Sequence, residues 1–201
     1  MTELPDWFGR SIERIDELNG QDPRRMTLAG ESGPQEFLMG RRAAFWLGLL
    51  DPAAAPEQLV AARAHHLRRW LRPRTDYPEG RAGYLRWRTD AKVHHAAELA
   101  RIMEAAGAPA GAVERAGSLV RKEHLRTDPA AGAHEDALCI TFLEAQLDDT
   151  AERLGDDALV PVLTKTMRKM TASGLALVGE IELSGHGRAL IERGAAGLGE
   201  Q

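Results

Sequence analysis

Apolar side chains recur at helical spacing along most of this chain, and that period is the strongest constraint on its fold. In segment 11–20, for example, Ile12, Ile15 and Leu18 lie three residues apart before a stop at Asn19 and Gly20. No segment alternates apolar and polar residues as a half-buried strand does. Similar helical patterns cover 35–50, 51–71, 84–107, 108–125, 134–149, 156–170 and 174–183.

We therefore predict an all-α fold, a single-domain helical bundle of about seven to eight helices with no sheet of consequence. Segment 21–34, rich in Gly, Pro and Ser, is expected to be a loop. A chain of 201 residues can bury a full hydrophobic core, and its low aromatic content of 5% favours helix over sheet. We predict one domain over 1–201, with its core at about 7–183 and a flexible tail at 192–201.

The chain carries no sequence signal for export or for a membrane. The N-terminal residues lack a basic stretch followed by an apolar one, and no apolar run approaches the roughly 18 to 20 residues that span a bilayer. The single cysteine, Cys139, excludes an internal disulfide and fits a reducing compartment. We expect a cytoplasmic protein with no membrane partner.

Positive charge is concentrated in one region of an otherwise acidic chain. Between Ala61 and His95 nine Arg and Lys residues face three acids, whereas the whole chain has a formal charge of −4. This asymmetry favours a small anionic ligand; nucleic acid is possible but not favoured, because it would call for a basic whole. A solvated helix face with internal ion pairs would give the same pattern. The candidate ligand-binding residues are Arg69, Arg72, Arg74, Arg81, Arg88 and Lys122.

Two adjacent pairs of histidines lie in this basic region. On a continuous helix, His66 shares a stripe with apolar residues, whereas His65 lies on a basic face. The same reasoning turns His95 toward the core and His94 away from it. A fifth histidine, His134, is expected to begin its helix as a solvated residue.

An aspartate on a third helix adds a carboxylate to these imidazoles. Asp136 lines up with apolar residues, where an unpaired carboxylate would cost several kcal/mol. Taken singly, each group has a structural explanation, a packed histidine or a salt-bridged aspartate. Together they suit a divalent transition metal such as iron, manganese, zinc or cobalt. We predict His66, His95 and Asp136 as metal ligands, with Glu135 and Lys122 as catalytic candidates.

Several stretches resemble a known family. The segments "HLRRWLRPRTDYPEGRAGYLRWR", "KVHHA", "RKEHLRTDP" and "EDALCITFLE" are similar to bacterial and fungal proteins grouped as domain of unknown function 4202, over about Ile12 to Met170. More distantly, the order of His66, His95 and Asp136 resembles the HD superfamily of helical metalloproteins. That signature has an aspartate directly after the second histidine, whereas this chain has Ala96.

The HD resemblance implies an HD-domain-like bundle and a metal-dependent hydrolase acting on a small anionic, phosphorylated compound. An HD-type non-heme iron oxygenase would use the same ligands. A non-catalytic anion-binding or RNA-binding regulatory protein would keep the arginines and need no metal. In that case the histidines would be packed and Asp136 would pair with an arginine.

Overall fold

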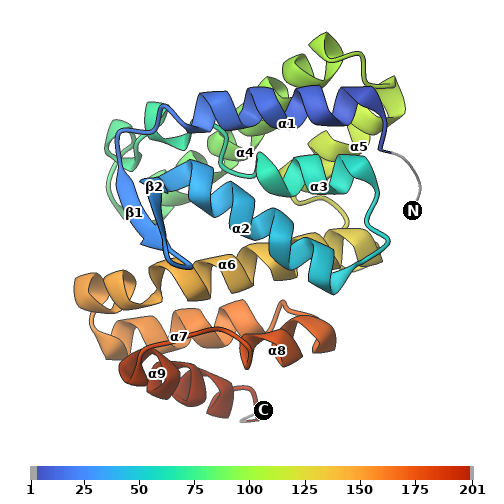
Figure 1. Ribbon diagram of the computed structural model, residues 1–201. Coiled ribbons are helices and arrows are strands. Elements are labelled where there is room, and N and C mark those ends of the chain that lie inside the picture. The colour runs from blue at the N-terminus through green and yellow to red at the C-terminus, as the bar shows by residue number, and fades with distance from the viewer. Residues whose placement is uncertain (1–3, 200–201) are drawn as a thin grey trace.

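The protein is a bundle of helices with one short hairpin near its N-terminus (Figure 1). The computed structural model describes residues 4–199. Its α-helices are α1 (Asp6–Asn19), α2 (Gln35–Leu50), α3 (Pro56–Arg63), α4 (Gly80–Ala105), α5 (Ala110–Arg121), α6 (Pro129–Leu154), α7 (Asp156–Met167), α8 (Ala172–Val178) and α9 (Gly185–Ala196). Two single-turn 3₁₀ helices, η1 (Arg69–Leu71) and η2 (Arg74–Asp76), lie between α3 and α4. The predicted all-α fold is confirmed, with somewhat more helices than expected.

The loop expected before α2 contains an antiparallel hairpin of β1 (Arg25–Leu28) and β2 (Glu31–Pro34), so that expectation is wrong. Ala29 and Gly30 form its two-residue turn with φ values of 51° and 78°. Positive φ at both positions gives the twist that a tight hairpin needs. The strands are too short to show a period, and Leu28 packs against the start of α2. The hairpin therefore packs against the N-terminal part of α2, which it directly precedes in the chain.

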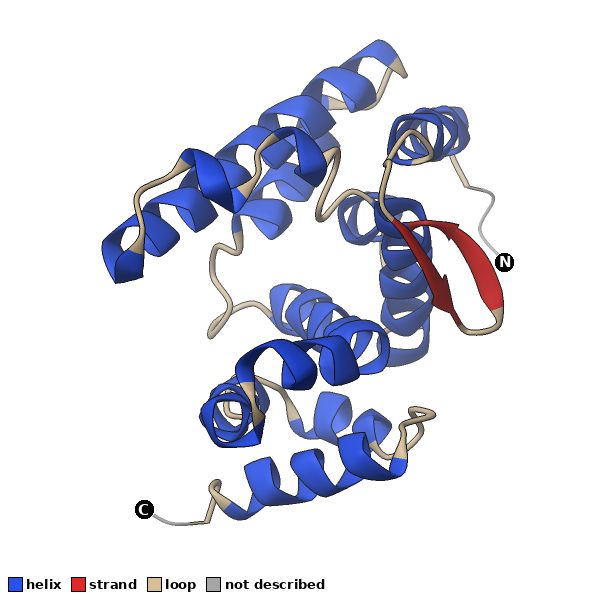
Figure 2. Ribbon diagram, turned by 90° about the vertical axis from the view of Figure 1, so that its left-hand side faces the viewer, coloured by secondary structure: helices blue, strands red, loops and turns tan. Residues whose placement is uncertain are grey.

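The helices form two hydrophobic cores that meet along α3 and α6. Ile15 belongs to the N-terminal core of α1, α3, α4 and α5, and Ile140 to the C-terminal core of α2 and α6 to α9. Within α3, Val60 faces the first core and Ala62 the second; within α6, Ala131 faces the first and most other apolar residues the second. Figure 2 shows the two groups of helices one above the other, with the hairpin at one edge.

Helical structure at the C-terminal end extends further along the chain than the sequence pattern predicted. Helix α9 runs to Ala196, and Gly194 lies so close to Leu163 and Met167 that an added Cβ would clash with both. Leu190 is buried in the C-terminal core, which therefore extends past residue 183. The predicted flexible tail at 192–201 is helical over its first half, and its last two residues lie outside the described part of the chain.

None of the helices in the described range 4–199 is both long enough and apolar enough to cross a membrane.

A buried ion pair connects α2 to α6. The Arg42 guanidinium donates to both oxygens of Glu144, at 2.5 and 2.6 Å, and Trp46 Nε1 donates to the same carboxylate at 2.8 Å. The Glu144 side chain is only 8% exposed. Truncating it would leave the partly buried Arg42 and the buried Trp46 without this acceptor.

We expect Glu144→Ala to lower the free energy of unfolding by about 2 to 4 kcal/mol, because it removes one partner of a largely buried pair. Glu31→Ala removes the exposed carboxylate that pairs with Arg41 at 2.8 Å and should change it by less than about 1 kcal/mol. Urea denaturation of both variants measures the difference. Equal effects would contradict a structural role for the α2–α6 pair.

Candidate functional site

The paired histidines lie beyond the end of α3, in a turn that changes which of them is buried. Helix α3 ends at Arg63, and Arg68 has a φ of 51° with its N–H donating to Asn19 Oδ1 at 3.0 Å. His65 is buried, and its Nδ1 donates to the Ala62 carbonyl at 2.9 Å. The His66 side chain is 31% exposed. The prediction that His66 faces the core and His65 the surface is therefore wrong, since no continuous helix joins the two.

A close helix crossing fixes the position of this turn. Gly40 of α2 lies against the Arg63 carbonyl so closely that any Cβ at position 40 would overlap it. Helices α2 and α3 consequently approach each other without a side chain between them. The turn after Arg63 is thereby held next to the first turn of α2.

The first turn of α2 supplies a buried carboxylate to this turn. Glu36 is 2% exposed, and its Oε1 accepts from Arg24 at 2.8 Å. Arg24 also donates to both oxygens of Asp22, and Asp22 Oδ2 accepts from the Glu36 backbone N–H at 3.1 Å. Burial raises the pKa of Glu36, while the charges of His65, Arg24 and Arg69 oppose the rise. Helical periodicity did not identify this residue, because its partners Asp22 and Arg24 are brought to it by the hairpin that was not predicted.

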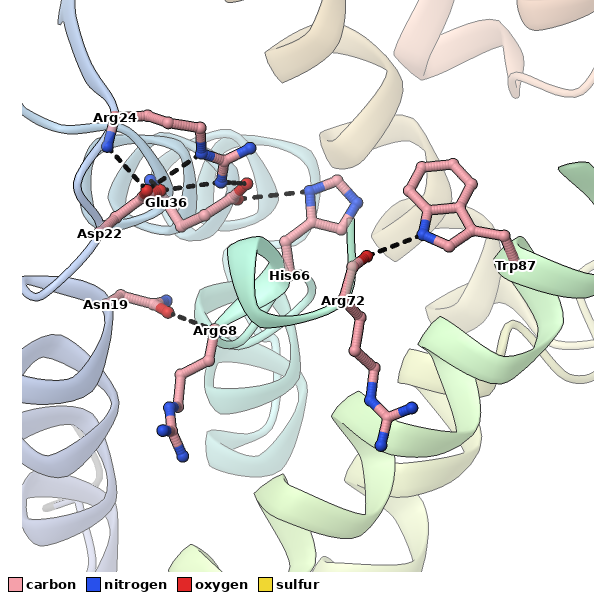
Figure 3. A network of polar contacts seen from close by, with 8 residues as sticks. All are labelled: Asn19, Asp22, Arg24, Glu36, His66, Arg68, Arg72 and Trp87. Carbon is pink, nitrogen blue, oxygen red and sulfur yellow. Dashed lines mark hydrogen bonds and ion pairs between the residues drawn. The ribbon is translucent and has the colours of Figure 1, made fainter. Parts of the chain in front are cut away.

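Glu36 faces one ring nitrogen of His66. Its Oε2 lies 3.4 Å from His66 Nδ1 and has no hydrogen-bond partner among the residues of 4–199. The other ring nitrogen lies on the side away from Glu36 (Figure 3). Burial and the charges of Arg69, His95 and Lys122 hold the pKa of His66 well below its usual range. His66 therefore has one ring nitrogen beside a carboxylate, while its other nitrogen forms no hydrogen bond with the residues of 4–199.

Two further imidazoles are buried near this pair. His95 of α4, predicted to face inward, is 1% exposed, and its ring centroid lies 6.1 Å from that of His66. His134 of α6, expected to be solvated, is also 1% exposed, so that expectation is wrong. The four ring nitrogens of His95 and His134 have no hydrogen-bond partner in the described chain. Burial lowers the pKa of both to about 4; the charge of Arg69 adds to this at His95, and that of Lys122 at His134. A weak interaction with the Leu67 backbone opposes the shift at His95.

A buried carboxylate holds two lysines at one side of the site. Glu135 of α6 accepts from Lys122 at 2.6 Å and from Lys169 at 2.9 Å. Burial alone would raise the pKa of Glu135, but the two ammonium groups lower it to about 2. Lys122, at the C-terminal end of α5, has a φ of 62°, which turns the chain toward α6. The two catalytic candidates, Glu135 and Lys122, are thus paired, and Lys169 was not predicted.

Of the five predicted arginines, two lie with this cluster. Arg69 stacks on Trp87 with 4.6 Å from its Cζ to the ring centroid, and it donates no hydrogen bond to any residue the structure describes. Burial lowers the pKa of Arg69, and the nearby charges of Arg24 and Arg88 lower it further while Glu36 opposes them. Arg88 is exposed on α4 and is close enough to Arg69 to influence it.

The other three arginines point elsewhere. Arg74 donates to the carbonyls of Tyr77 and Pro78 at 2.8 Å and so stabilises its own loop. Arg72 accepts from Trp87 Nε1 through its carbonyl at 2.9 Å, while its side chain lies away from His66 (Figure 3). Arg81 is exposed in the first turn of α4. Arg72 also lines a separate cavity of about 510 Å³ with Asp76, Tyr77, His94 and Glu98.

Asp136 is buried, as predicted, but its partner is a helix terminus. Its two oxygens accept from the backbone N–H and the hydroxyl of Thr171, the residue that caps α8. Gly174 packs directly over the carboxylate. Within residues 4–199, no three His, Cys, Asp or Glu side chains are grouped so that they could hold a metal ion. Asp136 therefore does not join His66 and His95 in a ready-made site for iron, manganese, zinc or cobalt.

A family model described as a domain of unknown function (DUF4202) matches residues 9–191. The chain belongs to the DUF4202 family. No curated protein and no solved structure matches it. The DUF4202 match covers most of both hydrophobic cores and all of the buried polar residues described above, from Asp22 before the hairpin to Lys169 after α7.

The buried imidazoles should make this DUF4202 protein sensitive to mild acid. His95 and His134 have pKa values of about 4 in the fold against 6.5 in the unfolded chain. Below pH 6.5 the unfolded chain therefore binds protons that the folded chain does not, and stability is lost as the pH falls toward 4. At pH 5.5 we expect a loss of about 1 kcal/mol for each histidine relative to pH 7.5.

Urea denaturation at pH 7.5, 6.5 and 5.5 measures this loss. Glu135 contributes little in that window because its pKa of about 2 lies far below it, and the raised pKa of Glu36 acts in the opposite direction. His134→Leu removes one of the buried histidines at similar volume and should give a shallower dependence on pH. A slope identical to that of the wild-type protein would show that His134 is not neutral in the fold.

The position of Asp136 gives a separate test of the metal prediction. Asp136→Asn keeps an oxygen for the Thr171 N–H and offers an amide to its hydroxyl, so the free energy of unfolding should change by less than about 1 kcal/mol. Titration with Mn²⁺ or Zn²⁺, read by calorimetry, should be the same for the variant and the wild type. One equivalent of metal bound by the wild type and lost in the variant would restore Asp136 as a ligand.

Proposed function

We propose that this protein is a hydrolase that acts on a small phosphorylated compound, with His66 in contact with the reacting phosphate. The observation that carries the proposal is the environment of His66. A buried carboxylate lies 3.4 Å from one ring nitrogen, and the other nitrogen belongs to a partly exposed ring surrounded by cations. Imidazoles oriented by carboxylates in this way are common reacting groups in hydrolases.

The charges around His66 suit a phosphate. Arg69 and Lys122 act on the His66 ring, and Arg88 lies close enough to act on both Arg69 and Lys169. Neither Arg69 nor Arg88 forms an ion pair with a carboxylate of the described chain. Glu135 neutralises only one of its two lysines. The cluster therefore has positive charge to spare for an anionic ligand, and guanidinium and ammonium groups both bind phosphate oxygens well.

Hydrolysis of a phosphorylated compound is also what the distant HD resemblance implies. The proposal does not include the metal site of His66, His95 and Asp136 that the same resemblance implies. Both oxygens of Asp136 are engaged by Thr171, and His66 has Glu36 beside it instead. No step of the reaction is assigned to a metal for this reason. Cys139 is not assigned a role in the reaction, because it is buried in the C-terminal core and burial raises its pKa to about 11. We propose the cytoplasm as the site of action, which a single free cysteine suits.

The proposal is tested by hydrolysis of a panel of phosphate monoesters: p-nitrophenyl phosphate, sugar phosphates and nucleotides. We expect release of inorganic phosphate from at least one of them, and His66→Gln should reduce kcat roughly a hundredfold or more. His186→Gln is the control, because His186 is exposed and pairs with Asp156 at the far end of the C-terminal core. Failure of the wild-type protein to hydrolyse any of these esters would refute the proposed hydrolase activity.

Binding of inorganic phosphate separates catalysis from simple anion binding. Arg88→Gln should weaken phosphate binding several-fold, because it removes an unpaired cation of the cluster. Arg86→Gln, which removes an exposed cation two residues away, should leave it unchanged. Phosphate binding that depends on Arg88 but is accompanied by no hydrolysis would indicate a non-catalytic anion-binding protein.

A further inference from the structure

The two ring nitrogens of His66 are in different surroundings. Nδ1 faces the Glu36 carboxylate, which is itself fixed at its other oxygen by Arg24. A carboxylate beside Nδ1 keeps the proton on that nitrogen and leaves a lone pair on Nε2. Figure 3 shows this second nitrogen on the side of the ring away from Glu36, facing the side of the view where Arg72 and Trp87 are drawn. The lone pair is thus presented away from the Glu36 carboxylate.

This arrangement makes Nε2 available as a nucleophile. With the ring proton on Nδ1 beside the Glu36 carboxylate, the lone pair lies on Nε2, and a neutral imidazole with a free lone pair is a competent nucleophile.

We propose that His66 is a covalent catalyst whose Nε2 takes the phosphoryl group from the substrate and forms a phosphohistidine. This inference rests on the proposed hydrolase function and specifies its mechanism. Arg69, Lys122 and Arg24 are within electrostatic reach of the ring. Arg24 is engaged by Asp22 and Glu36, so Arg69 and Lys122 are the groups that bind the transferred phosphoryl oxygens. Glu36 is a positioning residue, since it acts through the imidazole.

The reaction balances in two steps. In the first, the Nε2 lone pair forms a bond to phosphorus and the bond from phosphorus to the substrate oxygen breaks. The departing oxygen keeps that electron pair and takes a proton from the Lys122 ammonium. In the second, water attacks phosphorus, its proton returns to Lys122, and the N–P bond breaks with its electrons returning to Nε2. The sum is a phosphate ester and water giving an alcohol and inorganic phosphate.

The opposing nitrogen stays protonated throughout. When Nε2 carries the phosphoryl group the ring becomes cationic, and the adjacent Glu36 carboxylate stabilises that charge. The carboxylate is well placed because its Oε2 has no other partner in the described chain and can move closer to Nδ1. A long contact in the unliganded protein that tightens on reaction is common at active sites.

The experiment uses phosphoramidate, a small phosphoryl donor, with the full-length protein. Intact-mass spectrometry should show the gain of one phosphoryl group, stable in base and lost in acid, as N–P bonds are. Peptide mapping should place it on His66. His66→Gln should remove the label, and His186→Gln should be labelled like the wild type. Glu36→Gln keeps the size of the side chain but not its charge, and should be labelled roughly 10- to 100-fold more slowly.

The outcomes separate the covalent mechanism from the hydrolase itself. Hydrolysis of a phosphate ester that depends on His66, with no label from phosphoramidate or from that ester in rapid-quench samples, would overturn the covalent step and leave the hydrolase standing. Label on another histidine, or equal label in His66→Gln, would also overturn it. If the wild-type protein hydrolyses no phosphate ester, the proposed function itself is refuted. Circular dichroism of each variant checks that it is folded.

Discussion

The burial of one carboxylate, that of Glu36, is the constraint on which the polar interior depends. A carboxylate taken out of water costs several kcal/mol unless its neighbours compensate. Here the compensation comes from Arg24, held in place by Asp22, and from the imidazole of His66. Asp22 and Arg24 precede the hairpin and Glu36 follows it, and the Gln35 N–H donates to the Arg24 carbonyl at 2.9 Å. The hairpin thus closes the loop that brings a guanidinium to the carboxylate.

The buried histidines His95 and His134 lower the free energy of unfolding. Leucine at the positions of His95 and His134 would fill the space without leaving polar atoms unpaired, whereas each imidazole there leaves two nitrogens without a hydrogen bond in the described chain. Such groups cost about 1 to 3 kcal/mol each. Departures from good packing of this kind are expected at functional sites rather than in a purely structural interior. Together with the unpaired arginines, they set this region apart from the rest of the bundle.

Helical periodicity predicted the fold class and the inward direction of His95 and Asp136, because those residues lie within the two longest helices. It failed at His65 and His66, where the chain leaves the helix at Arg63 and a helical wheel no longer applies. It also failed at His134, one turn into α6, because the helix start is covered by other helices and is not solvated.

Helical periodicity cannot predict which side chains pair when they lie on elements distant in sequence. Glu36 could not be matched with His66, nor Lys169 with Glu135, since each pair joins elements distant in sequence. Asp136 shows the same limit, because its direction was predicted and its partner, Thr171, was not. The charge pattern identified Arg69 and Arg88 but could not distinguish them from Arg74, which is engaged by its own loop.

The contact between Gly40 and the Arg63 carbonyl has a consequence for the geometry of Glu36 and His66. Glu36 lies one helical turn before Gly40, and His66 lies three residues after Arg63, so both groups are carried by the two backbones that touch at this point. The distance between the Glu36 carboxylate and the His66 imidazole therefore depends on a direct contact between two backbones, with no flexible side chain between them. Any side chain larger than the hydrogen atom of glycine at position 40 would push the two backbones apart and move Glu36 away from His66.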